Sequence, residues 1–304
     1  MTPPPRLAGI ELGGTKSIAV LAEGHEIVAE ASIATRDPHS TLAELNGQLL
    51  AWDRAEPLAG LGIASFGPLQ LDCSTPGFGS ILATPKPGWS GARVAEALTL
   101  GLAIPWRIDT DVNGAALAEY MWGAGQGCDS VCYLTIGTGV GGGLVIGGAC
   151  VHGAMHPEIG HLRLRRAPGD SFAGACPFHG DCIEGLVSGP ALAARFAQSP
   201  SAIPDDDPRW AYVASDIAEL FGALLLAASP QRILLGGSVA LARQGVIDRA
   251  RGLVVERYGA YLPYLTLRNA GQLIGIASLG ARAGPLGAIA LASLSTRRPS
   301  VLSV

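Results

Sequence analysis

The stretch at residues 131–147, VCYLTIGTGVGGGLVIG, decides the fold. Apolar and β-branched residues stand on both sides of a run of glycines, which is typical of a strand, a tight turn and a second strand. The same pattern occurs at residues 7–22, LAGIELGGTKSIAVLA. Two copies of a unit that begins with a hairpin predict an internally duplicated α/β protein with a cleft between its two halves.

The glycine run in the second copy contains a literal G-x-G-x-x-G at residues 137–142. The dinucleotide-binding fingerprint requires a helix directly after these glycines, whereas the following LVIGG predicts a strand. We therefore reject a dinucleotide site. Backbone N–H groups of a glycine turn can instead approach a phosphate closely, because no Cβ obstructs them. The candidate phosphate contacts are Gly13, Gly14, Thr15 and Lys16 in the first copy and Gly137, Thr138 and Gly139 in the second.

Taken alone, either turn is more simply an ordinary hairpin, and the repetition makes phosphate binding an equal alternative. A third glycine pair, Gly236-Gly237-Ser238, lies where a strand enters a helix, a position that suits an adenine or ribose contact. The pattern along the chain predicts further strands near residues 27–33, 61–66, 106–109, 232–235 and 273–276. Helices are predicted at 41–53, at 91–102, from about Asn113, over much of 189–226 and at 281–293.

These elements predict a smaller N-terminal domain at residues 1–112 and a larger α/β domain at 113–280. A C-terminal helix at about 281–296 is expected to pack back on the smaller domain. The Pro- and Gly-rich segment 75–89, which ends in TPKPGW, is expected to be a loop, and loops of this size in compact domains are often functional.

Composition excludes several classes of function. Apolar residues make up 48% of the 304 residues and charged residues only 15%, which predicts extensive burial. The net charge of −4, without a basic run, argues against nucleic acid or an anionic membrane as a partner. The first residues lack the apolar region of a signal peptide, and the most apolar run, near 220–228, is too short to span a bilayer. Six cysteines fit a reducing compartment, so we expect a cytoplasmic protein.

A metal site is predicted in the segment 156–184. Cys176, His179 and Cys182 follow a C-x2-H-x2-C spacing, and His161 lies upstream across a loop. Two cysteines and two histidines complete a tetrahedral zinc site, and four protein ligands leave no open position, so the metal would be structural. His152 and His156 are alternative ligands that fit the spacing less economically.

Carboxylates near this cluster are candidates for binding a polyol. Glu158 and Glu184 flank it, and His161 could hold zinc with one ring nitrogen and a sugar oxygen with the other. The plainer alternatives are a surface acid for Glu184 and a purely structural ligand for His161. Asp111 ends a predicted strand before a helix, where it is either a general base or a helix cap. Asp109 is expected to be structural.

Taken in order, the segments GIELGGTKS at 9–17, TIGTGVGGG at 135–143, EIGH at 158–161, the Cys/His knuckle and LGGSVA at 235–240 resemble the ROK family of sugar kinases. Ala64–Pro68 with TPKPGW, TDVNGAA at 110–116 and CPFHGDCIEGLVSGP at 176–190 resemble its bacterial fructokinase branch. The resemblance covers nearly the whole chain, from Gly9 to about Ala290.

The resemblance implies an actin-like, ribonuclease H-like duplicated ATPase fold, MgATP as the phosphoryl donor and a homodimer. It implies Asp111 as the base, sugar contacts from Glu158, His161 and Glu184, and zinc on the knuckle residues with His161. Gly67, Pro68 and Asn113 lie in the matching segments and are further substrate candidates. Glu11 stands where Asp is usual and Thr110 where Asn is usual, which puts glucose rather than catalysis in doubt.

The function expected from the sequence is therefore ATP-dependent phosphorylation of a hexose, with D-fructose to fructose 6-phosphate favoured. Three alternatives remain open at this point. One is a kinase of mannose, glucose or an N-acetylhexosamine. A second is a sugar-binding sensor that has kept the fold and lost the chemistry. The third is an interaction module organised by zinc.

Overall fold

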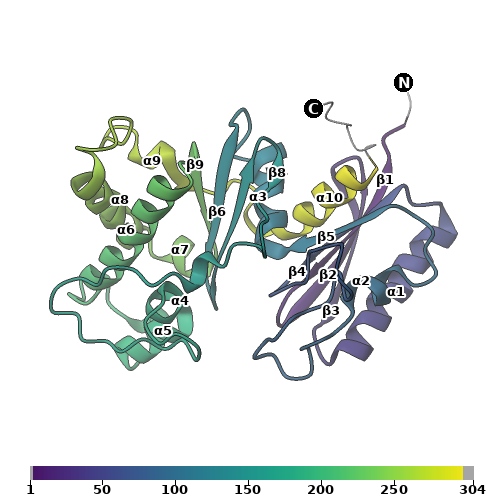
Figure 1. Ribbon diagram of the computed structural model, residues 1–304, viewed down its shortest axis with the longest axis horizontal. Coiled ribbons are helices and arrows are strands. Elements are labelled where there is room, and N and C mark those ends of the chain that lie inside the picture. Colours follow the sequence, from purple (N-terminus) through teal and green to yellow (C-terminus); the bar gives the residue numbers. More distant parts are fainter. Residues whose placement is uncertain (1–2, 297–304) are drawn as a thin grey trace. The chain divides into compact units, whose positions relative to one another are not determined.

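The computed structural model describes residues 3–296 and divides into two compact units (Figure 1). Unit 1 comprises Met1–Trp122, Ala149–His156 and Leu279–Val304, and unit 2 comprises Gly123–Gly148 and Pro157–Ser278. Each unit is built on a five-stranded mixed sheet with helices packed against it, so the chain has the α/β class expected from its sequence.

The sheet of unit 1 has the strand order β3-β2-β1-β4-β5. β1 pairs antiparallel with β2 and parallel with β4, which pairs parallel with β5. The register aligns Leu12 of β1 with Ser65 of β4, and Ser65 with Thr110 of β5. Three parallel strands therefore end side by side at one edge. The strands are β1 (Arg6–Leu12), β2 (Lys16–Glu23), β3 (Glu26–Ala34), β4 (Gly60–Ser65) and β5 (Trp106–Thr110).

Helices cover both faces of this sheet. α1 (Pro38–Ala55) and α2 (Val94–Thr99) pack on one face, where Leu42, Leu45 and Leu98 join the main hydrophobic cluster with β1 and β4. α3 (Asp111–Trp122) and α10 (Ala283–Ser295) lie on the other face, and Figure 1 shows α10, in yellow, against the purple N-terminal strands. The helix predicted at 91–102 is shorter than expected, because Gly91 and Gly101 adopt positive φ angles of 78° that no helix accommodates.

Unit 2 has the strand order β10-β9-β6-β7-β8. The residues after the glycine run form β7, paired antiparallel with β6, so the rejection of a dinucleotide fingerprint is confirmed. The strands are β6 (Ser130–Ile136), β7 (Val140–Ile146), β8 (Ala149–Cys150), β9 (Arg232–Gly236) and β10 (Ile274–Ile276). The helices are α4 (Ile183–Val187), α5 (Gly189–Phe196), α6 (Trp210–Ala227), α7 (Ser238–Ala242), α8 (Gln244–Tyr258) and α9 (Ala270–Leu273). Short 3-10 turns occur at η1 (Ile159–His161), η2 (Pro200–Ala202) and η3 (Gly280–Arg282).

α6 corrects one expectation from the sequence. The apolar run near 220–228 belongs to an 18-residue helix that is long and apolar enough, by length and composition, to cross a membrane. However, 67% of that helix is buried inside the protein, including Phe221 and Leu225. Such burial is the mark of a core helix, since the core helix of a globular domain passes the same test of length and hydropathy.

α10 approaches the sheet and α3 so closely that its backbone touches theirs. A Cβ on Gly62 of β4 would lie 1.8 Å from the carbonyl oxygen of Ala288, and a Cβ on Gly287 would lie 2.4 Å from the carbonyl carbon of Gly114. No rotamer change can relieve these contacts, since the obstructing atoms belong to the backbone. The glycines therefore set how near α10 and α3 lie to the sheet.

We predict that Gly62→Ala lowers the free energy of unfolding by about 1–3 kcal/mol or more, because the added methyl group must push α10 from the sheet. Thermal or urea unfolding measures this loss. Gly47→Ala is the matched control, since Gly47 lies within α1 and a Cβ there meets no atom within 4 Å. The control should be neutral or slightly stabilising. Equal midpoints for the two variants would contradict the close packing of α10.

Candidate active site

Three segments with candidate functional residues begin where the parallel strands of unit 1 end together. The turn Gly13–Lys16 follows β1, the Gly67-Pro68 turn follows β4, and Asp111 follows β5. Ligands of open α/β sheets bind at the carboxyl ends of the strands. The register of unit 1 thus brings one predicted phosphate turn, the predicted base and one predicted substrate turn to a single edge.

The phosphate turn of unit 1 is braced by the end of β3. Thr35 donates from Oγ1 to the carbonyl of Gly13 at 2.8 Å and from its backbone N–H to the carbonyl of Thr15 at 2.9 Å. The hydroxyl of Ser17, which is fully buried, lies 2.7 Å from Thr35 Oγ1. A Cβ on Gly14 would meet no atom within 4 Å. The turn is therefore held from behind, and its middle is open to a ligand.

Asp111 is the first residue of α3, and its Oδ1 accepts from the backbone N–H of Val112 at 2.9 Å. The capping bond is made by another residue, because Thr110 Oγ1 accepts from the N–H of Asn113 at 3.1 Å. The cap explanation for Asp111 thus loses its main support. Burial raises the pKa of Asp111 to about 6, a value suited to a base that is ionised at neutral pH.

Asp109 is structural, as its sequence position suggested. It is only 3% exposed, and its Oδ1 accepts from the N–H of Thr110 at 2.7 Å and from Nδ2 of Asn113 at 2.8 Å. Its Oδ2 lies 3.0 Å from Nε2 of His152, and the hydrogen bond to Asp109 raises the pKa of that imidazole. The sequence did not reveal this cluster, since His152 is 43 residues from Asp109 and shares no motif with it.

The two polar atoms in the side chain of Asn113, a substrate candidate, have different surroundings. Its amide nitrogen is held by Asp109, while its Oδ1 is buried without a hydrogen-bond partner among the described residues. A buried acceptor without a donor costs free energy unless a ligand supplies one. The oxygen is therefore suited to accept from a substrate hydroxyl, and its orientation is fixed by Asp109.

The Gly67-Pro68 turn has a cis peptide bond and is anchored by His156, which the sequence offered only as an alternative metal ligand. Nε2 of His156, which is 6% exposed, accepts from the backbone N–H of Leu69 at 3.0 Å. This acceptor position requires the tautomer with the proton on Nδ1. His156 thus holds the predicted substrate turn in place and belongs to no metal cluster among the described residues.

Glu11, at the end of β1, is a second acid with a shifted pKa. Burial, with a smaller contribution from the charge of Asp111, raises the pKa of Glu11 to about 7. Its carboxylate lies so close to the start of α10 that a Cβ on Gly284 would fall 2.1 Å from Oε1. Two neighbouring carboxyl groups with raised pKa values mark this edge of the sheet as a functional region.

In unit 2, Val140 of the second glycine turn contacts Glu184 and the segment that carries Glu158, the other candidate sugar acid. Its backbone N–H donates to Oε2 of Glu184 at 3.0 Å, so Glu184 is not a free surface acid. Its carbonyl oxygen faces Gly160, where a Cβ would lie only 1.8 Å away. Gly160 belongs to the segment that carries Glu158 and His161. The predicted sugar-binding and phosphate-binding segments of unit 2 therefore meet at one residue.

The third glycine pair packs against the same turn. Gly237 has a φ of 86°, and a Cβ there would lie 2.5 Å from the carbonyl oxygen of Ile136. The position of a Cβ on Gly137 is 3.5 Å from Oγ of Ser238. The backbone N–H of Gly189, which begins α5, donates to the carbonyl of Gly137 at 2.7 Å. The nucleotide candidates 137–139 and 236–238, far apart in sequence, thus form one continuous surface.

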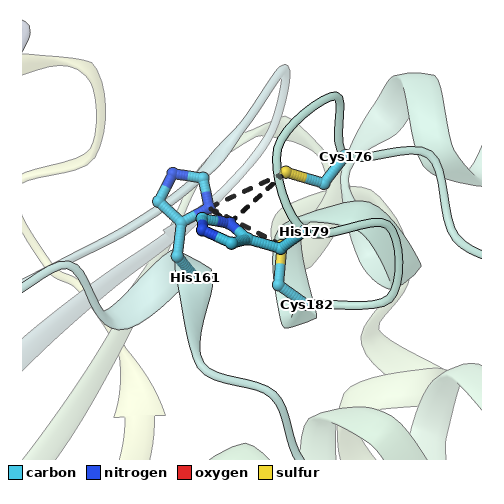
Figure 2. A group of neighbouring side chains, drawn as sticks. All are labelled: His161, Cys176, His179 and Cys182. Carbon is cyan, nitrogen blue, oxygen red and sulfur yellow. Dashed lines mark hydrogen bonds between the residues drawn. The ribbon is translucent and has the colours of Figure 1, made fainter. Parts of the chain in front are cut away.

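The predicted zinc ligands converge from two segments of unit 2, as Figure 2 shows. Nδ1 of His161 lies 3.9 Å from Sγ of Cys176, 3.6 Å from Sγ of Cys182 and 3.3 Å from Nδ1 of His179. Zn–N bonds of about 2.0 Å and Zn–S bonds of about 2.3 Å give tetrahedral edges of about 3.3–3.8 Å. The distances from His161 are close to these edges, and all four donor atoms lie within 4.8 Å of one another, so small side-chain shifts would let them bind one zinc ion.

The knuckle also fixes the position of Glu184. Backbone hydrogen bonds of 2.9 and 3.1 Å between Cys176 and Gly180 form its tight turn, and Cys182 directly precedes α4. Glu184 is the second residue of α4, so a metal on Cys182 would anchor the helix that presents this carboxylate to Val140. His161 turns Nδ1 toward the cluster, which leaves Nε2 as the atom able to contact a substrate.

Known proteins are similar to this chain in sequence and in fold. The model of the ROK family matches residues 7–294. The chain is 39% identical to a fructokinase of Zymomonas mobilis, over 93% of this chain and 95% of that protein. It is 36% identical to a fructokinase of Pediococcus pentosaceus, over 96% and 99% of the two chains. The crystal structure of a ROK hexokinase from Thermus thermophilus has a TM-score of 0.76, 28% identity and coverage of 95% and 98%.

We predict that the purified protein contains about one equivalent of zinc and that Cys182→Ser loses most of it. Elemental analysis measures the metal. The variant should also melt at a lower temperature, because a structural metal contributes directly to folding. Cys73→Ser is the control, since this free, exposed thiol lies outside the cluster. Full zinc content in Cys182→Ser, or no zinc in the wild type, would contradict the site.

Proposed function

Because the chain belongs to the ROK family, we propose that it transfers a phosphoryl group from ATP to a hydroxyl of a hexose, with D-fructose favoured and fructose 6-phosphate as product. The observation that supports this most is the shared edge of unit 1, where a phosphate turn follows β1 and an acid with a pKa of about 6 follows β5, the two strands that flank β4. The preference for fructose is supported by the two fructokinases named above.

Asp111 is assigned the role of general base. Its carboxylate is ionised at neutral pH and is held in orientation by the N–H of Val112 through Oδ1, which leaves Oδ2 to accept a proton. The acceptor hydroxyl of the sugar gives up its proton to this oxygen as it attacks the terminal phosphate. Such base catalysis contributes typically about 10²–10⁴-fold to the rate.

The glycine turns are assigned to the triphosphate. Gly13, Gly14, Thr15 and Lys16 in unit 1 offer backbone N–H groups and one ammonium group, while residues 137–139 and 236–238 serve the nucleotide in unit 2. Mg²⁺ bound with ATP would neutralise part of the phosphate charge. The chain itself holds the phosphate in line with the acceptor hydroxyl, since phosphoryl transfer relies mainly on positioning and electrostatics.

The remaining candidates are assigned to the sugar. Glu158, Glu184 and the Nε2 atom of His161 contribute acceptors and a donor from unit 2, and Asn113 contributes Oδ1. Glu184 has a double role, because its Oε2 already holds Val140 of the phosphate turn. The free thiols fit the cytoplasm as the location of such an enzyme, and a homodimer is part of the proposal.

We predict that Asp111→Asn lowers kcat by about 10²–10⁴-fold in a coupled assay with fructose and ATP, while the fold is retained. The amide keeps the shape of the side chain and removes the basic oxygen. Asp72→Asn, in an exposed loop after β4, is the control and should match the wild type. Turnover of Asp111→Asn near that of the wild type would remove Asp111 as the base.

The pH profile provides an independent prediction. The pKa of Asp111 is raised to about 6, so the base becomes protonated as the pH falls through 6, and kcat/KM should drop about tenfold per unit below it. An aspartate of ordinary pKa would retain activity down to about pH 4. Because Glu11 titrates near 7, the profile is repeated with Glu11→Gln. An acidic limb that persists near 6 in this variant supports Asp111, whereas its disappearance would assign the limb to Glu11.

A panel of hexoses tests the substrate. We expect the highest kcat/KM with fructose and lower values with mannose, glucose and N-acetylglucosamine, in agreement with the named relatives. The measurement is ADP release in the presence of each sugar. Preference for another hexose would correct the substrate but leave the kinase assignment intact. ADP release that is independent of every sugar would contradict the function itself.

A further inference from the structure

Lysine occurs at only two positions in the 304-residue chain, 16 and 86, although lysine and arginine together number 21. Both lysines belong to the first phosphate turn in the folded protein. Lys16 ends the turn at the start of β2, and Nζ of Lys86 donates to the carbonyl oxygen of Gly14 in its middle. Both lysines of the chain therefore lie at, or contact, the same four-residue turn.

Lys86 is held against the turn by an aromatic pair. Its Nζ lies 5.8 Å from the ring centre of Phe66 and 5.9 Å from that of Trp89, within the range of cation–π attraction. The two rings meet edge to face at 5.1 Å. Trp89 is fully buried and donates from Nε1 to the carbonyl of Arg36 at 2.9 Å, which fixes its orientation. The ammonium group is thus preorganised beside the turn, in a loop that is also held by the backbone bond from Trp89 N–H to the carbonyl of Lys86.

The surroundings of Lys86 leave it able to bind an anion. An ammonium group has three N–H donors, and the carbonyl of Gly14 takes one of them. No ion pair joins Lys86 or Lys16 to a carboxylate within residues 3–296, where the cations of the ion pairs are arginines and a histidine. If the hydrogen bond from Lys86 to Gly14 served only to hold the loop in place, a charged donor would not be required there. The charge of Lys16 acts on the nearby Glu11, where it partly offsets the rise in pKa caused by burial, whereas Lys86 forms no ion pair among the described residues. The glycine turn therefore keeps positive charge beside it that matches a phosphate group.

We propose that Lys86 is a second phosphate-binding cation, which keeps its bond to Gly14 and donates its remaining N–H groups to the terminal phosphate of the nucleotide. This proposal rests on the proposed function, because it concerns the same triphosphate. It gives the TPKPGW loop a chemical role, since the loop carries a charge that completes the turn Gly13–Lys16. It also explains why residue 86 is lysine rather than arginine, because a compact ammonium group fits a small turn better than the broad guanidinium group.

Kinetics test the proposal first. Lys86→Met should lower kcat/KM for ATP by roughly 10²-fold, which is the usual loss when one preorganised donor to a developing charge is removed. KM for the hexose should change by less than about twofold, and Lys86→Arg should recover part of the activity because it restores the charge. Arg93→Met removes an exposed cation that pairs only with Glu96 and is the matched control. An unchanged kcat/KM for ATP in Lys86→Met would overturn the proposal, as would a loss confined to the KM for the hexose.

A direct measurement avoids any dependence on turnover. Biosynthetic incorporation of ¹³Cε-lysine leaves all three N–H donors of each ammonium group in place and labels only two side chains here, so the NMR spectrum should contain two lysine Cε signals. Lys86→Arg identifies the signal of Lys86. The magnesium complex of AMPPNP should shift both lysine signals, whereas AMP, which lacks the outer phosphates, should leave them near their starting positions.

The two arms separate the possible failures. A response of Lys16 alone to AMPPNP would overturn the role of Lys86. If both signals respond but no hexose is phosphorylated, the phosphate-binding role stands and the proposed function fails. If Lys86→Met is too unstable for kinetics, the ¹³Cε-lysine-labelled wild-type protein still decides the question, because its ammonium groups and their N–H donors are unaltered.

Discussion

The backbone contact between α10 and the glycines of unit 1 is the constraint on which the rest of that unit depends. Because Gly62 has no side chain, the carbonyl of Ala288 in α10 can lie directly against β4. Because Gly287 has no side chain, α10 can likewise lie directly against Gly114 of α3. α10 comes from the end of the chain, yet it lies between the central strand and the helix that begins with Asp111. Its first turn also borders the carboxylate of Glu11. The positions of Glu11 and Asp111 are therefore set by how closely one helix can approach. Any larger residue at this contact would move Asp111, the proposed base, relative to the turn Gly13–Lys16.

In unit 2 the corresponding role falls to Val140. Two segments converge on this residue, one through the N–H group that holds Glu184 and one through the carbonyl that abuts Gly160. Each segment also supplies ligands to the metal cluster, His161 from one and Cys182 from the other. A structural zinc would thus tie together the two segments that carry the sugar candidates, at the point where both touch a phosphate turn. Such a metal would need no open coordination position, because its role would be to orient the two carboxylates.

The sequence predicted those features that local spacing encodes. Both hairpins and the order of most elements follow from periodicity and glycine placement, and the C-x2-H-x2-C spacing with His161 predicted the cluster of four side chains that could hold a metal. It missed those that depend on contacts between distant segments. Lys86 reaches Gly14 across 72 positions, and His156 reaches Leu69 across 87, so no spacing rule connects either pair. The sequence left open whether Asp111 caps α3, because aspartate and threonine are both favourable capping residues. The structure shows that Thr110 makes the capping bond.

The division of roles around α3 explains how a half-buried aspartate can remain available for chemistry. Thr110 caps the helix, and Asp109 takes the charge-assisted bonds to Asn113 and His152 that a buried carboxylate needs. Asp111 is left with one bond to Val112, too little to offset the loss of water, and burial therefore raises its pKa to about 6. The raised value means that the ionised form is less stable in the folded than in the unfolded chain, so this acid weakens the fold as the pH rises from about 4 to 6. A raised pKa alone does not mark a reactive group, because burial also raises the pKa of Asp216, which pairs with Arg195, to about 6. Asp170, held by Arg166 and Arg195, has its pKa lowered instead. What distinguishes Asp111 is that it follows β5 at the edge where the glycine turn also lies, and that no arginine pairs with it among the described residues.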